Sequence, residues 1–203
     1  MVAIIDYDAG NIKSVEKAVA LLGGEPVVTR EGNVILSADH VILPGVGSFG
    51  DAMEKLHQYG LVDVIRTVVE KETPFLGICL GLQLLFENSE ESNGVRGLGI
   101  LSGKVCRIPD EPGLKIPHIG WNSLQYPHPG RLYADVPEGS YVYFVHSYYL
   151  KAADESIVKA VTEYGTQIHA SVEQGNVFAC QFHPEKSSEV GLRILDNFLK
   201  IKN

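Results

Sequence analysis

Apolar positions in the first half of the chain alternate between two periodicities. Short runs of Val, Ile and Leu are typical of buried strands and occur at residues 2–6, 26–29, 40–43 and 74–78. Apolar residues three and four positions apart predict helices over residues 12–22, 51–59, 61–71 and 80–87. Asn11 is the expected N-cap of the first helix. Strands that alternate with helices in this way predict a parallel sheet with helices on both faces.

The second half of the chain has a different pattern. Strand-like runs follow one another at residues 103–108, 121–126, 140–150, 157–164, 168–173 and 177–182, and a helical pattern covers residues 190–201. The turn at residues 173–176 predicts a hairpin. We therefore expect one α/β domain over residues 1–203, with a sheet that is parallel at its centre and has an added antiparallel region toward one edge.

Composition narrows the functional classes. The 203 residues carry a net charge of −8 with no basic tract, which argues against nucleic acid as a partner. The apolar runs are too short to cross a bilayer, and the apolar start reads as a strand because no basic leader precedes it. The three cysteines are widely spaced and form no Cys-x-x-Cys pair, so we expect no disulfide framework and no zinc site. No set of residues suggests another metal or an organic cofactor, and we expect none. A reducing, cytoplasmic setting fits this cysteine usage best.

The segment around Cys79 is the strongest candidate for chemistry. The sequence Gly77-Ile78-Cys79-Leu80-Gly81 lies between a predicted strand and a predicted helix, which is the setting of a nucleophile elbow. The turn holds the nucleophile in a strained conformation, and glycines are needed on either side because larger side chains would collide. Alone, this pattern also fits a buried cysteine in a glycine-rich turn.

Residues that could assist Cys79 lie in two other segments. His183 and Glu185 are two positions apart in an extended stretch, so both side chains point to the same side and the carboxylate can orient the imidazole. The backbone N–H of Leu80 and one in the turn at residues 44–47, at Gly47, are candidate oxyanion donors. Gln83 lies one helical turn past Cys79, where it could hold a polar substrate group.

A glycine-rich segment after the third strand favours a different interpretation. Residues 45–50 match G-x-G-x-x-G, the pattern of a dinucleotide-binding turn. The segment follows a later strand rather than the first, and the next strand ends in Cys79 rather than in an acidic residue for a ribose. These two departures make the dinucleotide interpretation the weaker one.

Taken together, the Cys79 elbow and the sequence Gln181-Phe182-His183-Pro184-Glu185 resemble the class I (triad) glutamine amidotransferases over essentially the whole chain. The resemblance implies that Cys79 attacks the glutamine amide to form a γ-glutamyl thioester, that His183 transfers protons and that Glu185 orients His183. It further implies that glutamine is held by Gly45, Gln83, His146, Ser147 and Tyr148. Cys106 and Cys180 are expected to be packing residues.

Several other stretches, including residues 117–122 and 143–148, narrow the resemblance to glutaminase subunits of histidine biosynthesis. Such subunits supply ammonia to a separate cyclase subunit with a (βα)8 barrel, which makes imidazole glycerol phosphate and aminoimidazole carboxamide ribotide. The resemblance implies a heterodimer with that cyclase. The candidate interface residues are Gly10, Asn11, Trp121, Asn122, Tyr143 and Lys186. A core position for Trp121 fits the sequence equally well.

Three alternatives stay open at this point. The same glutaminase chemistry could serve a different synthase, since the triad does not name the partner. A non-catalytic regulatory subunit could keep the fold, although an intact Cys79, His183 and Glu185 argue against it. A nucleotide-binding module would use residues 45–50.

Overall fold

The fold is taken from a computed structural model, which describes residues 1–8 and 11–202. Its first half contains β1 (Val2–Ile5), α1 (Ile12–Leu21), β2 (Pro26–Thr29), α2 (Gly32–Leu36), β3 (His40–Gly45), α3 (Phe49–Gln58), α4 (Leu61–Glu70), β4 (Phe75–Cys79) and α5 (Leu80–Leu84). Its second half contains β5 (Asn88–Ser89), β6 (Gly103–Arg107), β7 (His118–Ser123), η1 (Arg131–Tyr133), β8 (Tyr141–His146), β9 (Tyr148–Ala152), η2 (Glu155–Ile157), β10 (Val158–Glu163), β11 (Gln167–Gln174), β12 (Val177–Cys180), η3 (Pro184–Lys186) and α6 (Ser188–Leu199).

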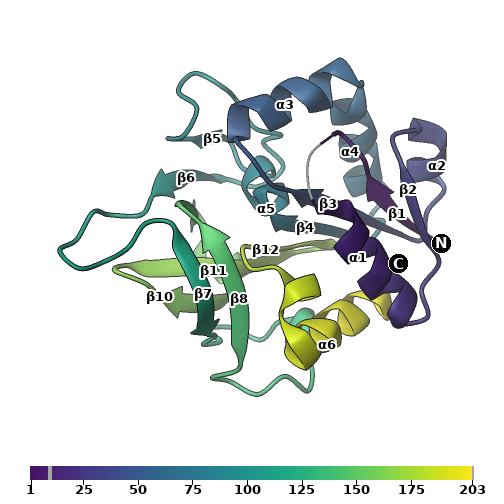
Figure 1. The fold of residues 1–203 in the computed structure, drawn as a ribbon. Coiled ribbons are helices and arrows are strands. Elements are labelled where there is room, and N and C mark those ends of the chain that lie inside the picture. The colour runs from purple at the N-terminus through teal and green to yellow at the C-terminus, as the bar shows by residue number, and fades with distance from the viewer. Residues whose placement is uncertain (9–10, 203) are drawn as a thin grey trace.

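A seven-stranded sheet in the order β10-β11-β12-β4-β3-β1-β2 forms the centre of the molecule (Figure 1). The strands from β12 to β2 pair in parallel, whereas β10, β11 and β12 pair antiparallel at one edge. This confirms the predicted mixed sheet. Two smaller units extend it: a sheet of β5, β6 and β9, and a two-stranded ribbon of β7 and β8.

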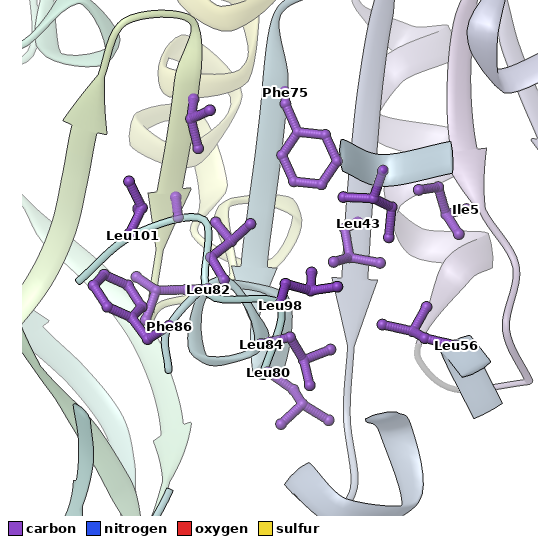
Figure 2. Packing of buried hydrophobic residues seen from close by; sticks show 14 of the residues in the cluster. Ile5, Leu43, Leu56, Phe75, Leu80, Leu82, Leu84, Phe86, Leu98 and Leu101 are labelled. Atoms are coloured by element: carbon purple, nitrogen blue, oxygen red, sulfur yellow. The ribbon is translucent and has the colours of Figure 1, made fainter. Parts of the chain in front are cut away.

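Alternating side chains of the strands supply two hydrophobic cores. In β1, Ala3 and Ile5 pack with the helices α3, α4 and α5, whereas Val2 and Ile4 pack with α1 and α6 on the opposite face. Figure 2 shows Leu80 and Leu84 of α5 in the first of these cores, near Leu43 of β3. Helices therefore cover both faces of the sheet, as the strand and helix alternation predicts.

Some expected boundaries are wrong. The expected strand at residues 140–150 is two strands, β8 and β9, which belong to different sheets and are separated only by Ser147. The expected strand at residues 121–126 begins earlier, at His118, and the helix after Cys79 ends at Leu84. Asn11 precedes α1, but its side chain makes no capping hydrogen bond. The short helix α2 and strand β5 were not predicted, because two to five residues are too few for a periodicity to appear.

Glycines allow α5 to lie against the ends of β3 and β4. A Cβ on Gly77 would lie 2.7 Å from the carbonyl oxygen of Gly81, and a Cβ on Gly81 would overlap the carbonyl oxygen of Leu43. Because backbone atoms cannot move aside cheaply, only glycine fits at either position. The expected steric need for glycine on both sides of Cys79 is confirmed.

The Gly81→Ala substitution should therefore lower the free energy of unfolding by about 3 kcal/mol, since the added methyl group meets backbone. Urea denaturation of the two proteins measures this difference. Gly32→Ala is the matched control, because its Cβ would meet only the Val64 side chain, at 3.1 Å, and its expected effect is within about 1 kcal/mol. Equal stability of Gly81→Ala and wild type would contradict the close approach.

Candidate active site

The carboxyl ends of three neighbouring strands bring the candidate residues together. Gly45 at the end of β3 is in register with Cys79 at the end of β4, and Cys180 at the end of β12 is in register with Ile78. The segment after β12 therefore continues past Cys79 and carries Gln181 and His183 to the same edge of the sheet. Clefts outside the carboxyl ends of parallel strands are where α/β proteins bind their ligands.

Cys79 has the backbone geometry of a nucleophile elbow. It is the last residue of β4 and directly precedes α5, with φ 55° and ψ −109°. Such a conformation is strained for a residue other than glycine and persists only where the surroundings impose it. Here the surroundings are the α5 packing contacts of Gly77 and Gly81, so the strain is held in place.

His183 and Glu185 form a buried pair beside Cys79. Nδ1 of His183 lies 2.8 Å from Oε1 of Glu185, and both side chains are at most 2% exposed. Burial disfavours the charged imidazole, but the interactions of the ring with the neighbouring Cys79 and Glu185 outweigh burial and raise the pKa of His183 to about 10. Nε2 of His183 is buried and has no hydrogen-bond partner among residues 1–8 and 11–202. That nitrogen is therefore free to exchange a proton at the site.

A cavity of about 300 Å³ lies over Cys79. Of the predicted residues, Gly47, Leu80, Gln83, Ser147, Tyr148, His146 and His183 line it, together with Cys79. Sequence reasoning missed Val46, Glu91, Pro117 and Val145 as lining residues. A volume of this size fits a small molecule. Glu91 was not predictable, because it lies in a loop with no motif and reaches the cavity only through the fold.

Glu91 and its neighbour Ser92 accept hydrogen bonds from the backbone at the end of the glycine-rich segment of residues 45–50. The Glu91 carboxylate accepts a hydrogen bond from the N–H of Phe49 at 2.8 Å, and Ser92 Oγ accepts from the N–H of Gly50 at 3.0 Å. The first N–H groups of α3 are therefore bonded to protein groups instead of being available to a phosphate. This arrangement weighs against the dinucleotide interpretation of residues 45–50.

The two candidate oxyanion donors lie on the cavity wall. Leu80 is the first residue of α5, so its N–H has no acceptor within the helix. Gly47 has a φ of 99°, a value that side chains rarely adopt, and a Cβ there would meet nothing within 4 Å. Backbone conformation, and not lack of space, is therefore what requires glycine at this position.

The side chains of Gln83 and Gln181 form a chain of polar contacts that leads from the Tyr148 carbonyl to Cys79. Nε2 of Gln83 donates to the carbonyl oxygen of Tyr148 and to Oε1 of Gln181, each at 3.0 Å. Nε2 of Gln181 in turn lies 3.7 Å from Sγ of Cys79. Both hydrogens of the Gln83 amide are used, so only its Oε1 is left for a ligand, and Gln83 can act toward substrate only as an acceptor.

Four other candidates have surroundings that either differ from the predicted substrate-binding role or fit a packing role. Gly45 does not line the cavity; a side chain there would collide with Tyr7 and Leu80, so its role is close packing. His146 lines the cavity, but its ring nitrogens bond to His118 and to the Tyr148 carbonyl. Cys106 and Cys180 are buried, and burial raises the pKa of both thiols, which fits packing residues.

Two of the candidate interface residues, Tyr143 and Lys186, lie next to His183 and Glu185. Trp121 is 52% exposed, so it is not a core residue, and it pairs across the ribbon with Tyr143 at a ring-centroid distance of 6.1 Å. The carbonyl oxygen of Tyr143 accepts from the N–H of His183, and Lys186 is exposed three residues further on. Asn11 and Asn122 are partly exposed, and Gly10 lies outside the described residues.

No helix of the described structure is long and apolar enough to cross a membrane.

Comparison with known proteins assigns a family to this arrangement. Residues 3–201 match the family described as glutamine amidotransferase class-I. The chain belongs to the class-I glutamine amidotransferases, and within them to the HisH family. It is 52% identical to the imidazole glycerol phosphate synthase subunit HisH of Moorella thermoacetica, over 97% of this chain and 93% of that protein. The HisH subunits of Synechocystis and Aquifex aeolicus are 50% and 52% identical, over 98% and 96% of this chain and 95% and 94% of theirs.

Two solved structures share the fold over nearly the whole chain. A crystal structure of a glutamine amidotransferase matches with a TM-score of 0.76 and 22% identity, covering 98% of both chains. The structure of PurLQS from Thermotoga maritima matches with a TM-score of 0.73 and 21% identity, covering 98% of this chain and 96% of that one. The predicted class-I glutamine amidotransferase fold is thereby confirmed.

The His183 pKa gives a pH-dependent contribution to stability. A histidine whose pKa rises from its ordinary 6.5 to about 10 on folding stabilises the fold fully below pH 6.5, and this contribution is lost as the pH rises toward 10. The stability difference between wild type and His183→Gln should therefore shrink from pH 6 to pH 10 in urea denaturation. The exposed His57→Gln is the matched control and should run parallel to wild type. A difference that stays constant over this range would contradict the buried ion pair.

Proposed function

We propose that Cys79, His183 and Glu185 are the catalytic triad of a glutaminase that supplies ammonia to a cyclase partner, as the HisH relatives suggest. The observation that carries the proposal is the arrangement of the His183 ring. One ring nitrogen is bound to Glu185 at 2.8 Å, and the other is left unpaired at a cavity that contains Cys79. This is the geometry that a nucleophile, its base and an orienting carboxylate require.

The reaction proceeds through two displacements at the side-chain carbonyl of glutamine. His183 takes the proton of the Cys79 thiol, and Sγ attacks the carbonyl carbon. The resulting oxyanion is held by the N–H of Leu80 and by an N–H at Gly47. The C–N bond then breaks while the imidazolium of His183 gives its proton to the leaving nitrogen, so ammonia departs and a γ-glutamyl thioester remains. Water gives a proton to His183, attacks the thioester and breaks the C–S bond, and glutamate is released. Glu185 keeps the imidazole oriented throughout.

The ribbon of β7 and β8 supports a partner surface next to the triad. Ile119 and Trp121 of β7 are 59% and 52% exposed, which is unusual for large apolar side chains. Aromatic anchors of this kind are frequent in protein interfaces. We place a cyclase subunit with a (βα)8 barrel on this surface, with Asn11, Tyr143 and Lys186 at its rim. Ammonia released at Cys79 would pass to the cyclase, which makes imidazole glycerol phosphate and aminoimidazole carboxamide ribotide.

Glutamate release from glutamine, measured for the chain alone and then with a histidine-pathway cyclase and its ribonucleotide ligand, tests both parts of the proposal. The cyclase mixture should stimulate release strongly. Cys79→Ala should lower release by roughly 1,000-fold or more, because the nucleophile is lost. Cys106→Ala and Cys180→Ala are matched controls and should keep activity.

An inactive Cys180→Ala that is still folded would contradict the assignment of the nucleophile. Activity that depends on Cys79 but does not respond to this cyclase would support the glutaminase assignment and contradict the choice of partner, which would then be a different synthase.

The turn at residues 44–47 gives a further prediction. A peptide flip at Val46–Gly47 can turn an N–H toward or away from the oxyanion, and partner contact would select the productive state. Gly47→Val and Gly47→Pro should each lower partner-stimulated turnover by about 100-fold, the usual cost of one oxyanion donor, while glutamine binding stays close to that of wild type. Gly23→Val is the control, since Gly23 has a φ of 82° and open space but lies after α1. Full stimulated turnover in the Gly47 variants would rule out the flip.

A further inference from the structure

Two histidines that the triad does not use lie buried beside the cavity. His118 of β7 is 3% exposed, and His146 at the end of β8 is 6% exposed. Nδ1 of His118 lies 3.0 Å from Nε2 of His146. The His118 ring also stacks on Phe144 and Tyr164, with ring centroids 4.9 Å and 3.8 Å apart. Both rings are therefore fixed in place by packing as well as by the hydrogen bond between them.

The carbonyl oxygen of Tyr148 determines the direction of each hydrogen bond in this pair. A carbonyl only accepts, so Nδ1 of His146, which lies 2.8 Å from it, must carry a proton. Burial lowers the pKa of His146 to about 3 and that of His118 to about 4, so both rings are neutral and carry one proton each. Nε2 of His146 is therefore an acceptor, and Nδ1 of His118 donates to it. Nε2 of His118 is then left as an acceptor facing the amide nitrogen of Asn122, at 3.5 Å.

The same carbonyl oxygen orients the groups that reach the nucleophile. It accepts a second hydrogen bond from Nε2 of Gln83, at 3.0 Å, so both of its lone pairs are used. The Gln83 amide then donates to Oε1 of Gln181, and the amide nitrogen of Gln181 is consequently the end that faces Sγ of Cys79. Two hydrogen-bonded branches thus meet at the Tyr148 carbonyl, one from Asn122 on the ribbon and one from Cys79.

The Tyr148 carbonyl lies where the chain turns from the ribbon into a different sheet. The ribbon strand β8 ends at His146, and β9 begins at Tyr148 in a different sheet, so Ser147 alone makes the turn between them. Ser147 and Tyr148 both line the cavity. A hydrogen bond from His146 to the carbonyl two residues ahead closes this turn, and His118 fixes the His146 ring from the opposite ribbon strand.

We propose that His118 and His146 are positioning residues for glutamine. They brace the turn at Ser147 and hold the Tyr148 carbonyl, so that the cavity wall and the Gln83–Gln181 pair keep their places relative to Cys79. The brace also ties the cavity to the ribbon that carries the exposed Trp121. The proposal rests on the glutaminase function proposed above, since it assigns a role in holding that enzyme's substrate.

The first test compares two substitutions of His118. His118→Phe keeps an aromatic ring for stacking but removes both hydrogen bonds, and it should raise KM for glutamine about tenfold while kcat changes less than about threefold. His118→Asn places an amide N–H near the position of Nδ1, and KM should return to within about threefold of wild type. Both are measured in the complex with the cyclase, with unfolding followed in parallel.

His40→Phe is the matched control. His40 is a partly buried histidine whose Nε2 lies 2.8 Å from the Ile201 carbonyl and whose ring packs against Phe198, away from the cavity. This variant should lose stability without a change in KM. An unchanged KM in folded His118→Phe, or an equal rise in KM in His40→Phe, would overturn the positioning role.

Two measurements test the brace without turnover. Nitrogen-15 spectra of the full chain at pH 7 should show His118 and His146 neutral, each with its proton on Nδ1; a proton on Nε2 of either ring, or a charged ring, would overturn the hydrogen-bond directions. Calorimetry in the Cys79→Ala background should show glutamine binding weakened about tenfold by His118→Phe. Weakened binding here supports the brace even if wild type releases no glutamate, a result that would instead contradict the proposed function; unchanged binding overturns the brace.

Discussion

The backbone of Cys79 lies in a conformation, φ 55° and ψ −109°, that costs about 1–3 kcal/mol for a side-chain-bearing residue. It persists because α5 is held against the strand ends, with Gly81 over the Leu43 carbonyl and Leu80 and Leu84 in the core (Figure 2). If α5 moved away from β3, Cys79 could relax, and its thiol would leave the cavity. The packing of one short helix therefore determines where the proposed nucleophile lies.

Strand register places the other residues of the site around that fixed point. Because β12 is parallel to β4 and aligned with it, the segment after Cys180 passes directly beside Cys79. Alternation then separates the roles of its residues: Cys180 lies in the core with Phe178, whereas Gln181 reaches Sγ of Cys79. A shift of one residue in this register would exchange these positions, so sheet pairing and the site depend on each other.

Sequence reasoning works well where a local pattern has a physical cause. The parallel sheet, the strained turn between two glycines and the pairing of His183 with Glu185 all follow from spacings of a few residues. It fails where a role depends on tertiary contacts. Glu91 reaches the cavity from a loop without a motif, and His146 bonds to His118 and Tyr148 instead of presenting a free ring. The corner at Ser147 was also missed, since an apolar run does not reveal that the chain changes sheets.

The buried polar side chains of the site fall into two groups: those whose polar atoms have hydrogen-bond partners, and those with an atom that has none. His118, His146, Gln83 and Gln181 are buried and bonded, as buried polar groups almost always are. Five buried side-chain atoms of the described chain lack a partner, and two of them, Nε2 of His183 and Oε2 of Glu185, belong to the proposed triad. An unpaired buried polar atom costs about 1–3 kcal/mol, and one that lies at a cavity can take its missing bond from a bound molecule. In this chain that nitrogen lies at the cavity that contains Cys79, which is where the proton transfers of amide hydrolysis require it.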